Sequence, residues 1–312
     1  MNEVNFGWRN IPAEVEALTP SLSHPSIKQH LPPLNQSKEV LGYDLYRKVI
    51  GTDIDAGPQG IGDCVSWGFA GGVDYIQAVQ IANILKDNNL LDTTVNDPAR
   101  KAIVDQFQQI ATEATYALSR VEVGKQINSY SDGSTGIWGS LSVTKWGVLS
   151  RKYLEDTLGP NQGKYNPNRA KQWGAKGLPD NLEPKAKQHL IKSSAPVTSF
   201  DEAAASIQNY YPVIICSNRG FTLQRDNQGF CKPQGTWYHC MKAIGVRWDR
   251  PGLLMLQSWG TKNPEGPLYK EQPGNSFWID ASVADYMLSQ KDSYNMSQFS
   301  DFRPQDFTDW GD

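Results

Sequence analysis

The sequence predicts an α+β fold in which a mainly helical half precedes and meets a strand-rich half. Apolar residues recur at spacings of three and four before residue 200, whereas short apolar runs bounded by turn residues follow Asp201. A chain of 312 residues is long enough for two such halves. We expect an N-terminal arm over residues 1–56, a mainly helical lobe over 57–200 and a β-rich lobe over 201–312.

The individual elements are predicted from local patterns. The arm holds several prolines and no sustained periodicity, so we expect it to be extended. Residues 155–197 are polar and rich in glycine, proline and asparagine, which indicates loops. Helices are predicted over about 64–89, 98–120, 137–146 and 202–209, and strands over 212–216, 241–248, 253–257 and 276–279.

Composition excludes several function classes. The 30 basic and 33 acidic residues give a net charge of −3, so nothing favours binding to nucleic acid or to an anionic membrane. The longest apolar runs, Val213–Cys216 and Leu253–Leu256, are far shorter than the ~20 residues of a spanning helix. The first five residues lack the pattern of a secretory signal. We therefore expect a soluble protein.

Cys64 has the setting of a reactive thiol. It follows a glycine-rich stretch, 57–62, and begins an apolar helix. The unpaired amides and positive dipole end of a helix N-terminus stabilise a thiolate over a thiol. A lone cysteine is more often a small buried hydrophobe, and this alternative stays open for Cys64. Of the other cysteines, Cys216 and Cys240 are expected in the core and Cys231 in a loop as a free thiol.

His239 is the best candidate for the base that a thiol nucleophile needs. It lies between a glycine turn with aromatic residues and an apolar run, which places it at a strand start. His24, His30 and His189 lie in proline-rich or polar stretches, and a structural role remains the alternative for His239. Gln257 ends the next apolar run, and its amide oxygen could accept the imidazole Nδ1–H and orient the ring.

These segments together resemble those of the papain-like cysteine peptidases, most closely the bacterial and viral members that lack a propeptide. The family's Gln-Gly turn, Gly-Ser-Cys and aromatic helix are similar to Gln59-Gly60-Ile61-Gly62-Asp63-Cys64 with Trp67 beyond. Its His-Ala-Val and Asn-Ser-Trp-Gly segments are similar to His239-Cys240-Met241 and Gln257-Ser258-Trp259-Gly260. Weaker likenesses extend from Phe6–Arg9 to 132–148, so the resemblance covers most of the chain.

The resemblance implies a helical lobe and an antiparallel, β-barrel-like lobe with the active-site cleft between them. It implies a peptidase in which the Cys64 thiolate, paired with protonated His239, attacks a peptide carbonyl carbon. Gln257 would orient His239, and the Gln59 side chain would bind the oxyanion together with the Cys64 backbone N–H.

The resemblance also implies substrate-binding roles and no cofactor. Trp259 would shield the bond between His239 and Gln257, and the backbone at Gly133 and Gly136 would pair with an extended peptide substrate. No metal is expected, because the sequence has no Cys-x-x-Cys pair and His239 beside Cys240 is a poor pair of ligands.

Four departures from the family pattern bear on activity. Gln257 replaces asparagine, which moves the amide outward by about one bond length. His239 follows Cys64 by 175 residues, against roughly 130 to 150 in the family, so we expect insertions over 87–115 and 155–200. The interval from Gln59 to Cys64 is one residue short. Asp63 replaces a small serine, and its charge would oppose a thiolate unless it caps the helix.

Two other functions fit the same residues. A papain-like fold without activity could serve as a binding or structural protein, for example a component of a phage or bacterial assembly. A thiol amidase or transferase could use the same pair of residues on peptidoglycan or isopeptide bonds. In each case the expected partner is a peptide or protein, and the absence of a signal or membrane segment favours a cytoplasmic or virion-associated location.

Overall fold

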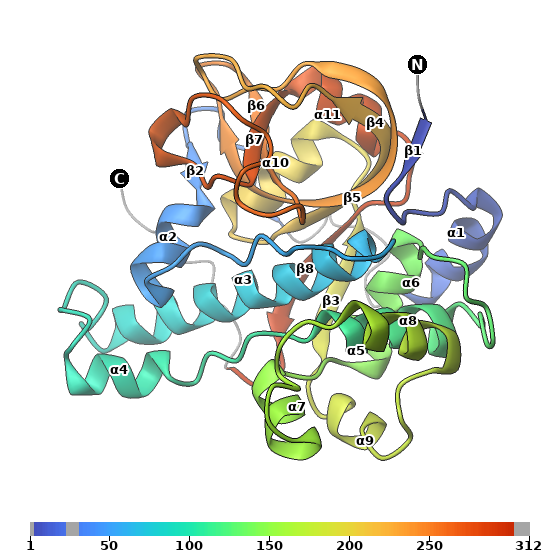
Figure 1. The fold of residues 1–312 in the computed structure, drawn as a ribbon. Helices are drawn as coiled ribbons and strands as arrows, with labels where there is room; N and C mark the ends of the chain where they lie inside the picture. Colours follow the sequence, from blue (N-terminus) through green and yellow to red (C-terminus); the bar gives the residue numbers. More distant parts are fainter. Residues whose placement is uncertain (1–2, 23–30, 303–312) are drawn as a thin grey trace.

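A computed structural model describes residues 3–22 and 31–302, so His24 and His30 lie outside the described residues. The predicted α+β class is confirmed. Figure 1 shows the strand-rich region in the upper part of the view and most helices below it, with the long helix α3 (Cys64–Asp87) crossing between the two. Within the described ranges, no helix is both long and apolar enough to cross a membrane.

The described strands form one eight-stranded sheet that does not close into a barrel. Six strands follow the order β3-β8-β4-β5-β6-β7, all antiparallel, while β1 and β2 pair with β5 outside this path. The expected barrel-like lobe is therefore an open sheet. The strands are β1 (Glu3–Asn5), β2 (Val40–Leu41), β3 (Ile191–Pro196), β4 (Val213–Phe221), β5 (Pro233–Arg247), β6 (Gly252–Leu256), β7 (Ser276–Asp280) and β8 (Tyr294–Phe299).

Both faces of this sheet are covered by helices. Along β4, Ile214 and Cys216 belong to the core against α3, whereas Val213 and Ile215 belong to the core against α10 (Phe200–Gln208) and α11 (Ala281–Leu288). This alternation follows from the two-residue period of a strand. It also explains why β4 is an apolar run and not an alternation of apolar and polar residues.

The helical region predicted over 98–120 is present but broken into two parts. Helix α4 (Pro98–Val104) ends early, and α5 (Thr112–Ala117) continues into a π-helical turn, Leu118–Val123. Between them, the Gln77 side chain of α3 donates to the Gln108 carbonyl (3.0 Å) and accepts from the Gln108 N–H (3.1 Å). Asp74 accepts from the Ile110 N–H at 2.9 Å. These side chains satisfy backbone groups that a helix would otherwise pair.

The expectation of loops over 155–197 is also wrong in large part. Asn166 caps α8 (Pro167–Lys176), Pro167 occupies its first turn, and Gly177 follows with a φ of +96°. These are ordinary helix signals that the polar composition obscured. The other elements here are α7 (Arg151–Leu158), α9 (Glu183–Ala186) and β3.

The arm is less extended than predicted. It forms α1 (Pro12–Leu18) and α2 (Gly42–Ile50) besides the short strands β1 and β2. Helix α2 has an amphipathic pattern, with Tyr43, Tyr46 and Val49 buried. The prediction over 137–146 is confirmed as α6 (Gly136–Leu141) followed by a π-helical turn, Ser142–Trp146.

Phe69 is a central contact between α3 and α6, and its truncation should destabilise the fold. The ring is fully buried and lies against Gly139, where an added Cβ would be 2.4 Å from it. We expect Phe69→Ala to lower the free energy of unfolding by about 3–5 kcal/mol, because it removes a buried ring and leaves a cavity. Urea unfolding would measure this. Val95→Ala, at a side chain that is 67% exposed, should change it by less than ~0.5 kcal/mol.

Candidate functional site

Cys64 is the first residue of α3, as predicted, and it is 0% exposed. The chain enters the helix from the loop 57–62, where Asp63 N–H donates to the Ile61 carbonyl at 2.9 Å. Asp63 stands at the N-cap position, but its side chain makes no capping bond to the helix. The capping role considered for Asp63 is therefore not realised. Its carboxylate oxygen Oδ2 instead accepts from the Tyr165 hydroxyl at 2.8 Å.

His239 lies inside β5 and not at its start, because the preceding residues pair with β1 and β4 and lengthen the strand. Its side chain is 1% exposed. The imidazole stacks on Trp259 with ring centroids 4.6 Å apart and 24° between the planes. Phe6 contacts the same imidazole at 5.3 Å with its ring tilted by 63°. Two aromatic rings thus pack against the candidate base.

Gln257 directly follows the last residue of β6, and it is buried. Its Nε2 donates to the Asn263 carbonyl at 2.6 Å, while its Oε1 has no hydrogen-bond partner among the described residues. Both ring nitrogens of His239 are also without a partner in the described part of the chain. In this conformation, the expected bonds from His239 to Cys64 and Gln257 are therefore not made, and the roles of the three residues stay predictions.

Gln59 joins three separate segments. Its Nε2 donates to the Phe6 carbonyl at 2.6 Å and to the Ile61 carbonyl at 2.8 Å. Its Oε1 accepts from the Ser258 hydroxyl at 2.8 Å, and its backbone N–H donates to the Ser258 carbonyl at 2.9 Å. The side chain predicted to bind an oxyanion thus already holds a peptide carbonyl oxygen.

The segment Glu3–Arg9, here called the strap, lies across the candidate site as the short strand β1 followed by a bend at Phe6 and Gly7. Phe6 and Trp8 N–H groups both donate to the Tyr238 carbonyl (2.9 and 3.3 Å). Ser134 N–H donates to the Gly7 carbonyl, and Arg9 N–H donates to the Ser134 carbonyl, each at 2.8 Å. Gly7 has a φ of +118°, and an added Cβ would be 2.1 Å from the Gly62 oxygen, so only glycine fits here.

The strap covers His239 and the loop that leads into Cys64. Phe6 covers His239 and packs on Trp259 with centroids 4.3 Å apart, while Gly7 lies on the loop before Cys64. A pocket of about 270 Å³ remains beside it, lined by Asn5, Phe6, Gln59, Gly60, Ile61, Gly62 and Trp259. Sequence reasoning noted Phe6–Arg9 as a likeness but did not predict that it fills the site.

The backbone groups of Gly133 and Gly136 already hold intramolecular partners. Gly133 N–H donates to the Tyr116 hydroxyl at 3.0 Å, and Gly136 N–H donates to Asp292 Oδ2 at 2.7 Å. Ser134, between them, is the residue that pairs with the strap. Ser134 lies within the stretch from Gly133 to Gly136 that was expected to pair with a substrate, and that role stays a prediction.

Electrostatics keep the closed site neutral. Burial lowers the pKa of His239 to about 3, with the nearby positive charge of Lys242 acting in the same direction. Burial also raises the pKa of the Cys64 thiol above its ordinary value, although hydrogen bonding from the backbone amides of Cys240 and Val65 opposes this. A thiolate–imidazolium pair is therefore disfavoured while the strap is in place.

The remaining cysteines are buried free thiols, as predicted for Cys216 and Cys240, and Cys231 is buried although it lies in a loop. Among the residues described, no group of three or more His, Cys, Asp or Glu side chains is placed to hold a metal ion.

Comparison with solved structures identifies the fold. Xylellain, a cysteine protease from Xylella fastidiosa, matches with a TM-score of 0.52 and 14% identity over 88% of this chain and 90% of that one. The proform of Amb a 11, a cysteine protease of ragweed pollen, matches with a TM-score of 0.50 and 13% identity over 89% of this chain and 70% of that one. No protein-family model and no curated protein matches the sequence. The chain therefore has the fold of papain-like cysteine proteases.

Removing the Phe6 ring should expose Cys64. We expect Phe6→Ala to raise the rate of iodoacetamide labelling of Cys64 about tenfold, because losing one buried aromatic contact favours opening of the strap. Mass spectrometry of the Cys64 peptide measures the rate, and the other buried cysteines serve as internal references. Val4→Ala, at an exposed position of the same strap, is the matched control. Equal rates in the two variants would contradict the covering role.

The depressed pKa of His239 should appear in the pH dependence of stability. The His239 imidazole takes up a proton near pH 6.5 in the unfolded chain but only near pH 3 in the folded chain. Its contribution to the free energy of unfolding is therefore complete above pH 6.5 and is lost as pH falls. Between pH 6.5 and 4 the loss should be about 3 kcal/mol. Urea unfolding of wild type and His239→Gln over this range tests it, and parallel curves would contradict the assignment.

Proposed function

We propose that this protein is a cysteine peptidase that hydrolyses peptide bonds through Cys64 and His239. The observation that supports this most is how the strap is held. The main chain of the strap bonds to Tyr238 and to Ser134, and its Phe6 carbonyl oxygen accepts from Gln59 beside the N-terminus of α3. A site that binds a peptide in this way, next to a thiol and an imidazole, has the parts required for acyl transfer.

In the proposed reaction, a substrate displaces the strap and occupies the same groove. His239 removes the proton from the Cys64 thiol, and the sulfur attacks the carbonyl carbon of the scissile bond. The developing oxyanion accepts hydrogen bonds from the Cys64 backbone N–H and from Gln59 Nε2, which gives up its bond to Phe6. Collapse of this intermediate breaks the C–N bond, and the amine leaves with the proton held by His239.

Hydrolysis of the thioester completes the cycle. His239 accepts a proton from water as the hydroxide attacks the acyl carbon, and the carboxylic acid leaves as the proton returns to the Cys64 sulfur. Gln257 Oε1 is the acceptor proposed for the other imidazole N–H, since it is buried and otherwise unpartnered among the described residues. Trp259, stacked on the imidazole, would exclude water from that bond.

Two observations favour a second candidate, a papain-like protein that binds peptides without cleaving them. The site is closed by the protein's own strap, and the hydrogen bonds expected of a working His239 are not made. On this alternative the groove would exchange the strap for a segment of another protein, and Cys64 would remain a buried thiol.

Peptide cleavage decides between the two candidates. We expect Cys64→Ala to reduce cleavage of a mixed peptide library at least about 10³-fold, because the nucleophile is lost. Cys231→Ala, another buried free thiol, should leave it unchanged. Both substitutions should be made with the native strap and with Phe6→Ala, and products identified by mass spectrometry.

Two other outcomes of the cleavage assay would indicate a different function. Equal activity of wild type and Cys64→Ala in both backgrounds would reject the peptidase and leave the binding protein. Cleavage restricted to peptidoglycan peptides or isopeptide-linked substrates, and lost in Cys64→Ala, would identify a thiol amidase.

A further inference from the structure

Tyr165 is connected to both ends of the loop that leads into Cys64. Its hydroxyl accepts from the Gly60 N–H at 3.1 Å and donates to Asp63 Oδ2 at 2.8 Å. Gly60 follows Gln59, and Asp63 precedes Cys64. One phenol hydroxyl therefore fixes the separation between the two residues proposed to bind the oxyanion.

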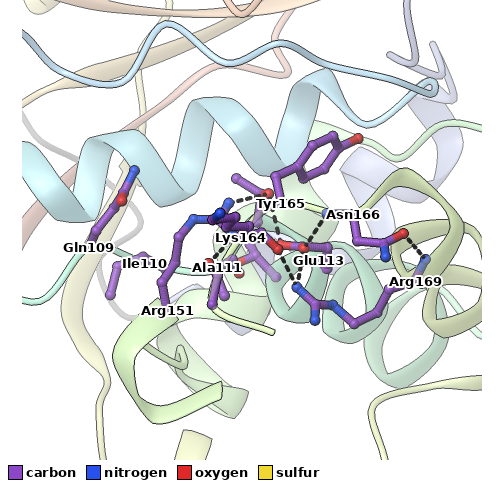
Figure 2. A network of polar contacts seen from close by, with 12 residues as sticks. Gln109, Ile110, Ala111, Glu113, Arg151, Lys164, Tyr165, Asn166 and Arg169 are labelled. Carbon is purple, nitrogen blue, oxygen red and sulfur yellow. Dashed lines mark hydrogen bonds and ion pairs between the residues drawn. The ribbon is translucent and has the colours of Figure 1, made fainter. Parts of the chain in front are cut away.

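The main chain on each side of Tyr165 is held by a buried ion-pair network (Figure 2). Asn166 N–H donates to Glu113 Oε1 at 2.9 Å, and Arg169 Nη2 donates to the Lys164 carbonyl at 2.7 Å. Arg169 also pairs with Glu113 at 2.6 Å, and Arg151 pairs with its other carboxylate oxygen at 3.1 Å. Figure 2 shows the Tyr165 ring projecting away from this network.

The buried Asp63 carboxyl needs a hydrogen-bond donor such as the Tyr165 hydroxyl. It is fully buried, and its Oδ1 has no hydrogen-bond partner in the described part of the chain. Burial raises the pKa of this carboxyl to about 8, while the bond from Tyr165 lowers it. The other acidic groups that act on it are Glu113, which is paired with two arginines, and Asp132, which is paired with Lys171. A neutral Asp63 does not oppose ionisation of the adjacent thiol.

We propose that Tyr165, through Gly60 and Asp63, is a positioning residue that fixes the loop 59–64 for the thiol chemistry, an inference that rests on the proposed function. The Tyr165 ring is held independently of its hydroxyl, because it packs edge-on against Trp67 of α3 with ring centroids 5.0 Å apart. Tyr165→Phe therefore removes the hydroxyl and keeps the packing. Substituting Glu113 would be a poorer test, since it leaves two buried arginines unpaired and threatens the fold.

The test combines steady-state kinetics on a peptide substrate with a double-mutant cycle in the full chain. We expect Tyr165→Phe to lower kcat about tenfold with KM changed less than about twofold, because a misplaced loop affects the transition state more than substrate binding. Gln59→Ala should lower kcat about 10²-fold, and adding Tyr165→Phe to it should cost little more. Additive losses would overturn the proposal, since Tyr165 would then not act through the loop.

A matched control is Tyr153→Phe on α7, at a tyrosine that lines a different pocket. Its kcat should equal that of wild type, and an equal loss there would mean that removing any tyrosine hydroxyl lowers kcat.

If wild type cleaves no peptide, the proposed function fails and the positioning role is judged by the pH profile of Cys64 alkylation. Tyr165→Phe and Asp63→Asn should then both move the inflection to lower pH, because each keeps negative charge away from Cys64. Unchanged profiles would overturn the positioning role by itself.

Discussion

The candidate site depends on the close contact between α3 and the sheet. An added Cβ at Gly68 would lie 3.0 Å from Ile214 and 3.1 Å from the Cys240 sulfur, and one at Gly72 would lie 2.3 Å from Met296. Larger residues at these positions would push the helix off the sheet. Because Cys240 directly follows His239, this contact sets where the first turn of α3, with Cys64, lies relative to the candidate base.

The second constraint is the exclusion of water. Burial of Cys64, Asp63 and His239 favours the neutral form of each, so the closed site does not favour a reactive thiolate. The strap contributes to this burial at His239, which Phe6 covers, and the Phe6 carbonyl group occupies the Gln59 amide. Displacement of the strap would therefore both open the site to a substrate and change the burial on which these pKa values depend.

The polar segment after α7 contacts the loop before Cys64, although it was expected to consist of loops. It supplies Tyr165 and the N-terminal turn of α8, and Glu113 of α5 anchors it from the opposite side. A buried carboxylate held by two arginines is costly to break, so this anchor is rigid. A segment that was predicted as an insertion thus lies against the loop that leads into Cys64.

The sequence alone determined the features that depend on neighbouring residues. The start of α3 at Cys64, the helix over 137–146 and the approximate positions of β4, β6 and β7 follow from local patterns. The choice of Cys64, His239 and Gln257 as candidates follows from their local settings, and that of Gln59 from the family resemblance. The ordered set of these segments also indicated the fold.

Only the tertiary structure decided what occupies the site and how its groups ionise. The contact of Phe6 with His239 and the bond of Tyr165 to Asp63 join residues far apart in the chain, where no local period or spacing applies. The broken helix after α4 has the same origin, because Gln77 and Asp74 of α3 satisfy its backbone groups. The pKa values depend on burial, and burial is a property of the packed molecule and not of any segment.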